Sequence, residues 1–308
     1  MLKNKLLVVL GPTASGKSDL AVDLALKYNG EIISADSRQI YKGLDIGSGK
    51  ITKKEMKGIP HYLLDVVKPQ TIFTVTQFKK KADRIIEDIL KRGKTPILAG
   101  GTGFYISAVI DNVILPEVKA NLALRKDLGL ADPSELFLML EKLDPERART
   151  IDAKNPRRLI RAIEIATALG KVPELNLLGR DASKWEVLQI GIKVDKEKLD
   201  ERIEKRFYKR VKAGIVEEAQ ELHKTGLTWV RMYQLGLAHK YIPLYIKNKI
   251  SKQEFIDKSI KEEQKYAKRQ RTWFKKDKTC LPARQGIKWF ELENIKNIHK
   301  TISNFLKK

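Results

Sequence analysis

The residues with the clearest chemical potential form one short loop near the start of the chain. In order they are Gly11, Pro12, Thr13, Ala14, Ser15, Gly16, Lys17 and Ser18. A glycine, four further residues and then Gly-Lys-Ser is the spacing of a phosphate-binding P-loop. In such a loop, backbone N–H groups surround the phosphate oxygens, the lysine adds a positive charge, and the serine hydroxyl can reach Mg²⁺. The motif predicts a nucleotide- or diphosphate-binding site with Mg²⁺ as cofactor and Ser18 as its protein ligand. It does not identify ATP or any other molecule as the owner of the phosphates.

Asp36 is the second candidate, because it follows a short predicted strand at Glu31–Ser34. P-loop ATPases usually carry an acid at the end of a further strand to position Mg²⁺, whereas the apolar segment Thr95–Ala99 runs into Gly100–Gly103. Ligands of open parallel sheets lie beyond the carboxyl ends of the strands, so Asp36 should face the phosphates. Three roles remain open for it: a magnesium ligand in a kinase-like enzyme, a general base that takes a proton from an acceptor, or a helix or turn cap.

The composition indicates a polyanionic partner. The chain has 61 Lys and Arg against 38 Asp and Glu, a net charge of +23, which favours nucleic acid over a membrane surface. The segment Lys265–Lys278 is rich in basic residues and also holds aromatic ones. We predict that its arginines contact RNA and that Trp273 and Phe274 belong to the core. The alternative is a lysine-rich surface whose charges are only solvated.

The hydrophobic pattern predicts the elements that position these groups. Strands at Lys5–Leu10, Glu31–Ser34 and Thr95–Ala99, with a helix after the loop, are typical of parallel βαβ units. A further amphipathic helix is expected over Phe78–Arg92. The predicted fold class is therefore α/β, a P-loop NTPase-like parallel sheet with flanking helices.

The middle of the chain has a different character. Asp132, Asp144 and Asn155 each precede a proline, an arrangement that favours a capped helix start. We predict an all-helical insertion domain at residues 116–184, within a core formed by residues 1–115 and 185–308. The core resumes with a strand over Val187–Val194 and includes a basic helix over Phe255–Phe274.

Other features narrow the class of protein. Cys280 is the single cysteine, which excludes an internal disulfide and a multi-cysteine zinc site and predicts a cytoplasmic setting. No segment approaches the about 20 consecutive apolar residues of a membrane helix, so no membrane partner is expected. The four histidines show no metal-ligand spacing. We expect a monomer.

Several further motifs follow the loop in a fixed order along the chain. Together with GPTASGKS they are DSRQIY (36–41), LDIGSGK (44–50), FTVTQF (73–78), GGTGFY (100–105), NPRRLIRAIE (155–164) and YAKRQRTWF (266–274). This set resembles the bacterial tRNA dimethylallyltransferases, also called isopentenylpyrophosphate transferases, over nearly the whole chain. The segment Met232–His239 matches the family only loosely. Residues 279–286 fit none of the motifs, and a surface loop is expected there before a short strand at Ile287–Phe290.

The resemblance implies transfer of a dimethylallyl group from dimethylallyl diphosphate to N6 of adenosine 37 in tRNA. It implies Asp36 as the general base, with the P-loop, Lys17 and Mg²⁺ holding the diphosphate leaving group and Arg206 acting near the donor. The helical insertion is expected to clasp the tRNA anticodon stem-loop. The tRNA-binding residues implied by the motifs are Asp36, Ser37, Arg38, Gln39, Thr102, Arg125, Arg157, Arg158, Leu159, Ile160 and Arg161.

Other functions use some of the same residues. A cytokinin-type enzyme prenylates free adenine nucleotides with the same loop and base, and a P-loop small-molecule kinase would use the loop for ATP. A non-catalytic RNA-binding protein could keep the loop as a remnant. The predicted helical insertion and the charge of +23 favour tRNA as the acceptor.

Overall fold

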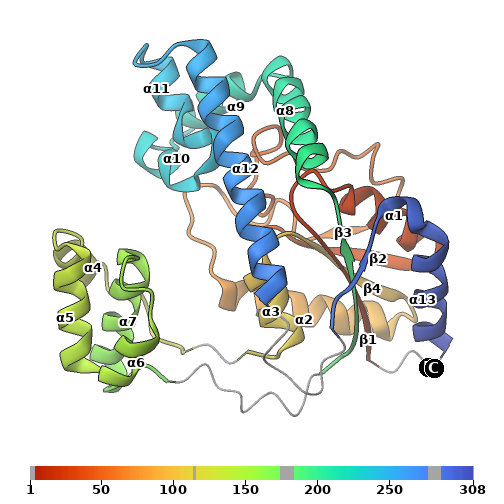
Figure 1. Cartoon of the computed structure of the whole chain (residues 1–308), viewed down its shortest axis with the longest axis horizontal. Helices are drawn as coiled ribbons and strands as arrows, with labels where there is room; N and C mark the ends of the chain where they lie inside the picture. Colours follow the sequence, from red (N-terminus) through yellow and green to blue (C-terminus); the bar gives the residue numbers. More distant parts are fainter. Residues whose placement is uncertain (1–3, 114–115, 174–183, 277–285, 308) are drawn as a thin grey trace. The chain divides into compact units, whose positions relative to one another are not determined.

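The computed structural model describes residues 4–113, 116–173, 184–276 and 286–307. The chain forms two compact units, one made of residues 1–112 with 182–308 and one made of residues 113–181 (Figure 1). In the described residues, no helix is both long and apolar enough to cross a membrane. The unmatched residues 279–285 lie outside the described residues.

The larger unit is built on a six-stranded sheet of order β3-β2-β4-β1-β5-β6, in which every pairing is parallel. The strands are β1 Lys5–Leu10, β2 Gly30–Ala35, β3 His61–Tyr62, β4 Thr95–Gly100, β5 Glu186–Ile192 and β6 Lys288–Phe290. The predicted α/β fold class with a parallel sheet and flanking helices is confirmed. β1 lies between β4 and β5, so the P-loop leaves the sheet near its centre.

The two faces of the sheet are covered by different helices. Along β1, Leu6 and Leu10 belong to one buried cluster and Leu7 to another, because successive strand residues point to opposite faces. The first cluster includes apolar residues of α2 (Val75–Lys91) and α3 (Gly103–Ile110). The second includes residues of α1 (Lys17–Lys27) and α13 (Ile295–Lys307). This layering holds the ends of the central strands in fixed positions.

α2 begins at Val75, three residues before the predicted start at Phe78. Thr74 accepts a hydrogen bond from the Gln77 N–H, and the Gln77 side chain accepts one from the Thr74 N–H. This capping box satisfies two N–H groups that otherwise lack partners at a helix start. Local hydrogen bonds therefore fix the polar first turn, and the apolar pattern used to predict the start of the helix does not reveal them.

A group of helices follows β5 in the chain and lies at one end of the sheet (Figure 1). Its members are α8 Lys196–Lys212, α9 Ile215–Lys224, α10 Trp229–Leu235, η2 Leu237–Lys240, α11 Ile242–Ile246 and α12 Lys252–Lys276. η3 Leu292–Asn294 instead precedes α13, and its Leu292 packs with the cluster that includes α1. α12 packs against α8, η2 and α3. It therefore connects this group to the loops that leave the sheet.

The smaller unit is helical in its described residues. Its helices are α4 Leu122–Leu128, α5 Pro133–Leu143, α6 Pro145–Thr150 and α7 Pro156–Leu169. Asp132, Asp144 and Asn155 cap α5, α6 and α7 with their side chains, as the sequence predicts. Leu136 and Leu140 of α5 pack with Leu159 of α7 in a core of this unit's own.

Candidate active site

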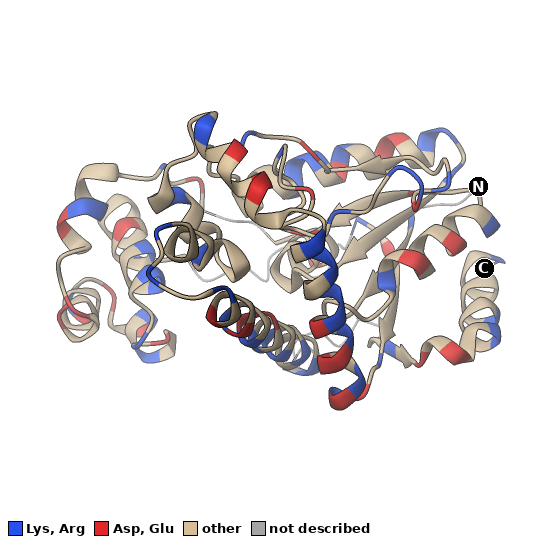
Figure 2. Ribbon diagram, turned by 90° about the horizontal axis from the view of Figure 1, so that it is seen from above, with Lys and Arg blue, Asp and Glu red and all other residues tan. Residues whose placement is uncertain are grey.

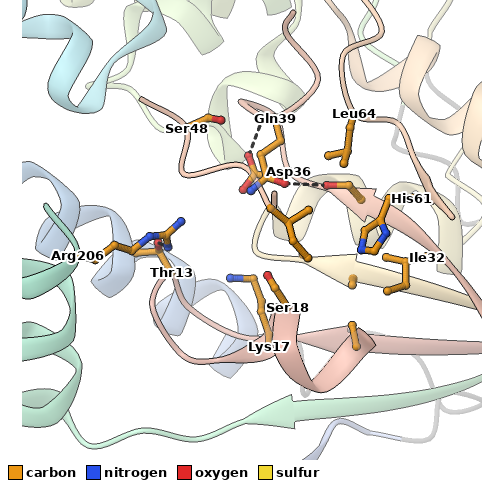
Figure 3. A pocket seen from close by; sticks show the side chains of 15 residues that line it. Thr13, Lys17, Ser18, Ile32, Asp36, Gln39, Ser48, His61, Leu64 and Arg206 are labelled. Carbon is orange, nitrogen blue, oxygen red and sulfur yellow. Dashed lines mark hydrogen bonds between the residues drawn. The ribbon is translucent and has the colours of Figure 1, made fainter. Parts of the chain in front are cut away.

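One cavity lies beyond the carboxyl ends of β1, β2 and β4 in the larger unit. Its lining brings together Lys17 of the P-loop, Asp36 after β2 and Arg206 of α8 (Figure 3). Thr13, Ser18 and Gln39 also line it. Residues that are distant in the sequence therefore share one space, as expected for ligand sites of open parallel sheets.

The P-loop links β1 to α1 with a sharply turned backbone. Ala14 has φ 59° and Gly16 has φ 87°, both in the left-handed region. A Cβ at Gly16 would also lie 2.6 Å from a side-chain carbon of Leu292, so glycine is needed there for two reasons. Gly11, Pro12 and Ser15 are buried, whereas Thr13 and Lys17 are partly accessible in the cavity. The loop thus presents the first N–H groups of α1 to the cavity, where they can bind an anion.

Two cations face the cavity without an ion-pair partner among the described residues. The Lys17 Nζ donates to the Pro12 carbonyl at 3.1 Å, and burial lowers the pKa of this lysine to about 8. Arg206 donates to the Thr13 hydroxyl at 3.3 Å and to the Gly49 carbonyl at 2.8 Å. Burial lowers the pKa of Arg206 as well, and neighbouring Arg210 lowers it further. The carboxylates of Asp36, Glu55 and Glu263 offset this positive charge without a direct ion pair, and a ligand with phosphate oxygens would stabilise it further.

Asp36 is both a turn residue and a cavity residue. Its Oδ1 accepts hydrogen bonds from the backbone N–H groups of Arg38 at 2.8 Å and Gln39 at 3.3 Å. The turn-capping role is therefore present. In the part of the chain that the structure describes, both hydrogen bonds reach the same oxygen, which leaves Oδ2 able to accept a proton. A capping role and a role as general base are compatible in this geometry.

The segment after Asp36 is held by the loop that follows β4. The Ser37 N–H donates to the Thr102 hydroxyl at 3.1 Å, and that hydroxyl lies 3.4 Å from the Ser37 hydroxyl. Gln39 donates from Nε2 to the Gly49 carbonyl at 3.3 Å. Arg38 is half-buried, and a Cβ at Gly236 would lie 3.8 Å from its Nη2, so Arg38 lies beside the segment that contains His239. Burial, followed by the charges of Arg38 and Arg210, lowers the pKa of His239 to about 3. The loosely matching segment Met232–His239 therefore packs beside the cavity.

α12 adds residues that the sequence does not assign to the site. The Gln270 side chain accepts from the Thr13 N–H at 2.8 Å and donates to the Gly101 carbonyl at 2.8 Å. Burial raises the pKa of Tyr266 to about 12, with a further contribution from the charge of Asp36. The sequence does contain a sign of Gln270: it is a polar residue on the apolar stripe of α12. Ala267, Gln270 and Phe274 lie three and four residues apart on that stripe, and all are buried.

The prediction that both aromatic residues near the end of α12 belong to the core is half wrong. Phe274 is 2% exposed, but Trp273 is 40% exposed. The two residues are neighbours on the helix and so point about 100° apart, and here Phe274 faces the core while Trp273 does not. Trp273 instead lies edge-on to exposed Phe104, with ring centroids 6.2 Å apart.

The smaller unit uses its predicted site residues in different ways. Glu164 is buried and pairs with both Arg125, at 2.8 Å, and Arg161. Arg157 and Arg158 are exposed, and Ile160 is partly buried. Leu159 is wholly buried, because its place in the helical repeat of α7 puts it in the core. Its side chain therefore belongs to the core of this unit, and a tRNA contact at Leu159 stays a prediction.

The cavity suits a magnesium ion that is shared with a ligand. Among the described residues, no group of three or more histidine, cysteine or acidic side chains could enclose a metal ion. The Ser18 hydroxyl lies exposed beside Lys17 at the start of α1. Mg²⁺ typically binds through one or two protein oxygens together with substrate phosphates, and Ser18 fits that pattern.

Basic residues are spread over the helices of both units (Figure 2). On α12, the Arg269 side chain is 59% exposed and pairs loosely with Glu262 at 3.4 Å. Lys268 and Lys275 are exposed or largely so. The face of α12 opposite Gln270 is therefore cationic and accessible.

Comparison with known proteins gives a consistent result. The family model described as IPP transferase matches residues 39–277. A tRNA dimethylallyltransferase from Thermoanaerobacter sp. strain X514 is 40% identical over 98% of this chain and 96% of its own length. The tRNA dimethylallyltransferase 1 of Syntrophus aciditrophicus is 38% identical over the full length of both chains.

Solved structures agree with the sequence comparisons. The full-length tRNA isopentenylpyrophosphate transferase of Bacillus halodurans aligns with a TM-score of 0.72 and 34% identity, over 99% of this chain and 97% of that one. A eukaryotic dimethylallyltransferase acting on tRNA aligns with a TM-score of 0.75 and 28% identity, over 88% of this chain and 70% of that one. The resemblance read from the motifs is confirmed, and the chain belongs to the IPP transferase family, which includes the tRNA dimethylallyltransferases.

Proposed function

We propose that this protein transfers the dimethylallyl group of dimethylallyl diphosphate to N6 of adenosine 37 in tRNA. The observation that carries the proposal is one cavity lined by two cations, Lys17 and Arg206, and by the carboxylate of Asp36. This combination suits a reaction in which an anion leaves from one side of a carbon and an amine loses a proton on the other. Family membership supports the same reaction.

The P-loop side of the cavity stabilises the leaving group. Diphosphate departs with its electron pair, so negative charge grows on the oxygen bound to the allylic carbon. The N–H groups at the start of α1, Lys17 and Arg206 are fixed before the reaction and stabilise that charge as it forms. When bound through Ser18 and the phosphates, Mg²⁺ would neutralise further charge there.

Asp36 accepts the proton from N6 of adenine. The exocyclic amine is a weak nucleophile, and removal of its proton as the new C–N bond forms prevents a cationic product. Oδ1 is held by the N–H groups of Arg38 and Gln39, which orients the carboxylate and leaves Oδ2 for this proton. The adenine reaches the cavity only after it leaves its stack, and this movement is less costly for an unpaired loop base than for a paired one.

The tRNA anticodon stem-loop binds basic residues outside the cavity. The exposed cations of α12 and the exposed Arg157 and Arg158 of α7 can contact backbone phosphates. Ser37, Arg38 and Thr102 lie beside Asp36 and are suited to contact the nucleotides around the target. Arg125 and Arg161 contribute mainly through the fold of the helical unit, because Glu164 already neutralises part of their charge. A single copy of the chain contains all these groups.

The test is a prenyl-transfer assay with dimethylallyl diphosphate, Mg²⁺ and a synthetic anticodon stem-loop that carries adenosine at positions 36, 37 and 38. Mass spectrometry of the nucleosides should find one dimethylallyl group on adenosine 37 and none when guanosine replaces it. Faster transfer to AMP than to the stem-loop would favour the free-nucleotide reaction. Transfer of the γ-phosphate of ATP to a small acceptor, with no prenyl transfer, would favour a kinase.

A further inference from the structure

Gln270 is a buried polar residue whose two amide ends bind the main chain of two different loops. Its Oε1 accepts from the Thr13 N–H and its Nε2 donates to the Gly101 carbonyl, each at 2.8 Å. The residue is 5% exposed. A buried amide without hydrogen-bond partners is costly, so this side chain ties both loops to α12 whenever the chain is folded.

The two loops leave neighbouring strands of the sheet. β4 pairs with β1, so the Gly100–Thr102 segment lies beside the P-loop. The P-loop faces the donor side of the cavity. The other loop carries Thr102, whose hydroxyl accepts from the N–H of Ser37, the residue after Asp36. Gln270 therefore connects the loop proposed to hold the diphosphate with the loop that anchors the proposed base.

We infer that Gln270 is a positioning residue for group transfer, one that fixes the P-loop relative to the loop that anchors Asp36. The inference rests on the proposed function, because it concerns the rate of that reaction. Gln270 acts through the two loops and touches neither reacting atom. Displacing a reacting group by about 1 Å can cost about 10²-fold in rate, which sets the size of the expected effect.

The contacts of Gln270 require this side chain and a glycine opposite it. A Cβ at Gly101 would lie 2.2 Å from the Gln270 Nε2, so any larger residue would displace the amide. A carboxylate at position 270 could accept from Thr13 but could not donate to Gly101. Asparagine is one methylene shorter and cannot span both partners. The Gly101 end of the bridge can therefore be broken alone by Gln270→Glu.

The experiment measures single-turnover prenyl transfer with both substrates saturating. Gln270→Ala, Gln270→Asn and Gln270→Glu should each lower the transfer rate by about 10²-fold, while the Kd for the stem-loop stays within about twofold. Gln253→Ala is the matched control, since Gln253 lies on the same helix, is exposed and bonds only locally to Asp257 in the described structure. The control should retain the wild-type rate.

A second variant tests the bridge from its other end with Gln270 intact. Gly101→Ala should slow transfer by a similar factor, because the new methyl group pushes the amide away. In the Gln270→Ala background the same change should have little further effect, since the clashing group is gone. Such non-additivity is the signature of one shared interaction. Additive effects of the two changes would contradict the inference.

Three outcomes separate a positioning role from its alternatives. A purely structural Gln270 would lower the thermal midpoint but leave the single-turnover rate of the folded protein unchanged. A role in RNA binding would raise the Kd for the stem-loop and leave the rate at saturating stem-loop unchanged. Either result would overturn the positioning role. If the wild-type chain transfers no prenyl group, the proposed function fails first, and the positioning role falls with it.

Discussion

The cations of the cavity and those of the helical unit have opposite electrostatic surroundings. In the described structure, Lys17 and Arg206 bond only to neutral oxygen atoms, and burial lowers the pKa of both. Arg125 and Arg161 instead share the buried carboxylate of Glu164. The family resemblance marks residues in both regions as site residues, but among the described residues only the first pair has no direct ion pair. We therefore expect Lys17 and Arg206 to lower the stability of the chain while they support the reaction, and Arg125 and Arg161 to stabilise the fold of the smaller unit.

The largest expected effect comes from Asp36→Asn in the cavity. Asparagine keeps an oxygen that can accept from the Arg38 and Gln39 N–H groups, so the turn survives, but it cannot take a proton. The single-turnover rate should fall by about 10³-fold, within the range of a missing general base. The Kd for the stem-loop, measured by filter binding, should stay within a few-fold. A fully active variant would remove Asp36 as the base.

Lys17→Met should lower the transfer rate by about 10²-fold, because it removes a charge that stabilises the leaving group. It should leave the free energy of unfolding unchanged or raise it, because the desolvated ammonium of Lys17 destabilises the folded chain. Denaturant titration at pH 7 measures the stability, with Lys57→Met as an exposed control. A lower stability in Lys17→Met would contradict the contrast between the two regions.

The pKa of Lys17 predicts a pH dependence of its own. Folding lowers the pKa of Lys17 from its ordinary value of 10.5 to about 8, so the folded chain holds this proton less tightly than the unfolded chain. The cationic form is therefore lost as pH rises through about 8, and kcat/KM for the donor should fall there. Linkage gives the matching sign for stability, since the penalty of Lys17 is present below pH 8 and fades between pH 8 and 10.5. In Lys17→Met, the fall in kcat/KM near pH 8 should be absent.

Local patterns in the sequence predict the elements, whereas long-range contacts assemble the site. The P-loop lies between its strand and its helix, and its spacing reveals it. The bonds from Arg206 and Gln270 to Thr13 span 193 and 257 residues, and no local pattern encodes such pairings. The resemblance to the family suggested Arg206 as a candidate near the donor, whereas Gln270 lies within the motif YAKRQRTWF but received no role there. Physical reasoning could have found Gln270 as a polar residue on a buried helical stripe.

In the smaller unit, the helical pattern shows which residues of a motif belong to the core. Leu159 and Ile163 are four residues apart on α7, and both are buried in the core of that unit. This helical spacing already favours a core position for the Leu159 side chain. Likewise, Arg161 precedes Glu164 by three residues, a spacing that favours an ion pair on one helix face.

Glu164→Gln tests the helical side of the comparison. Burial alone would raise the pKa of Glu164, but hydrogen bonds from Arg125 and Arg161 outweigh it and hold the pKa below its usual value. The change should destabilise the helical unit by about 2 kcal/mol, less than for a fully buried pair because both arginines are partly exposed. Hydrogen exchange of α4 and α7 amides measures this.

The transfer rate of Glu164→Gln at saturating stem-loop should stay within about twofold below its melting temperature. Acid should remove the same stability from the wild-type chain. Because folding lowers the pKa of Glu164, its carboxylate stabilises the fold fully above the pKa of the unfolded chain. That stabilisation is lost as pH falls through the pKa of the folded chain. If Glu164→Gln lowered the transfer rate without lowering the stability, Glu164 would have a role in the reaction and not in the fold.

The smallest expected effect concerns the exposed cations of α12. Replacing Lys268 and Arg269 together by alanine should raise the Kd for the stem-loop by about tenfold at moderate salt. It should also reduce the slope of log K against log salt by about 0.7–0.9 for each phosphate group that these side chains neutralise.

Lys258→Ala, at the other end of the helix and paired with Glu254, should leave that slope unchanged. Because Arg269 is already loosely held by Glu262, most of the effect should come from Lys268, which the two single variants can apportion. An unchanged slope in the double variant would mean that Lys268 and Arg269 are only solvated and do not contact RNA phosphates. The stem-loop would then have to be bound by the smaller unit and by the residues around the cavity.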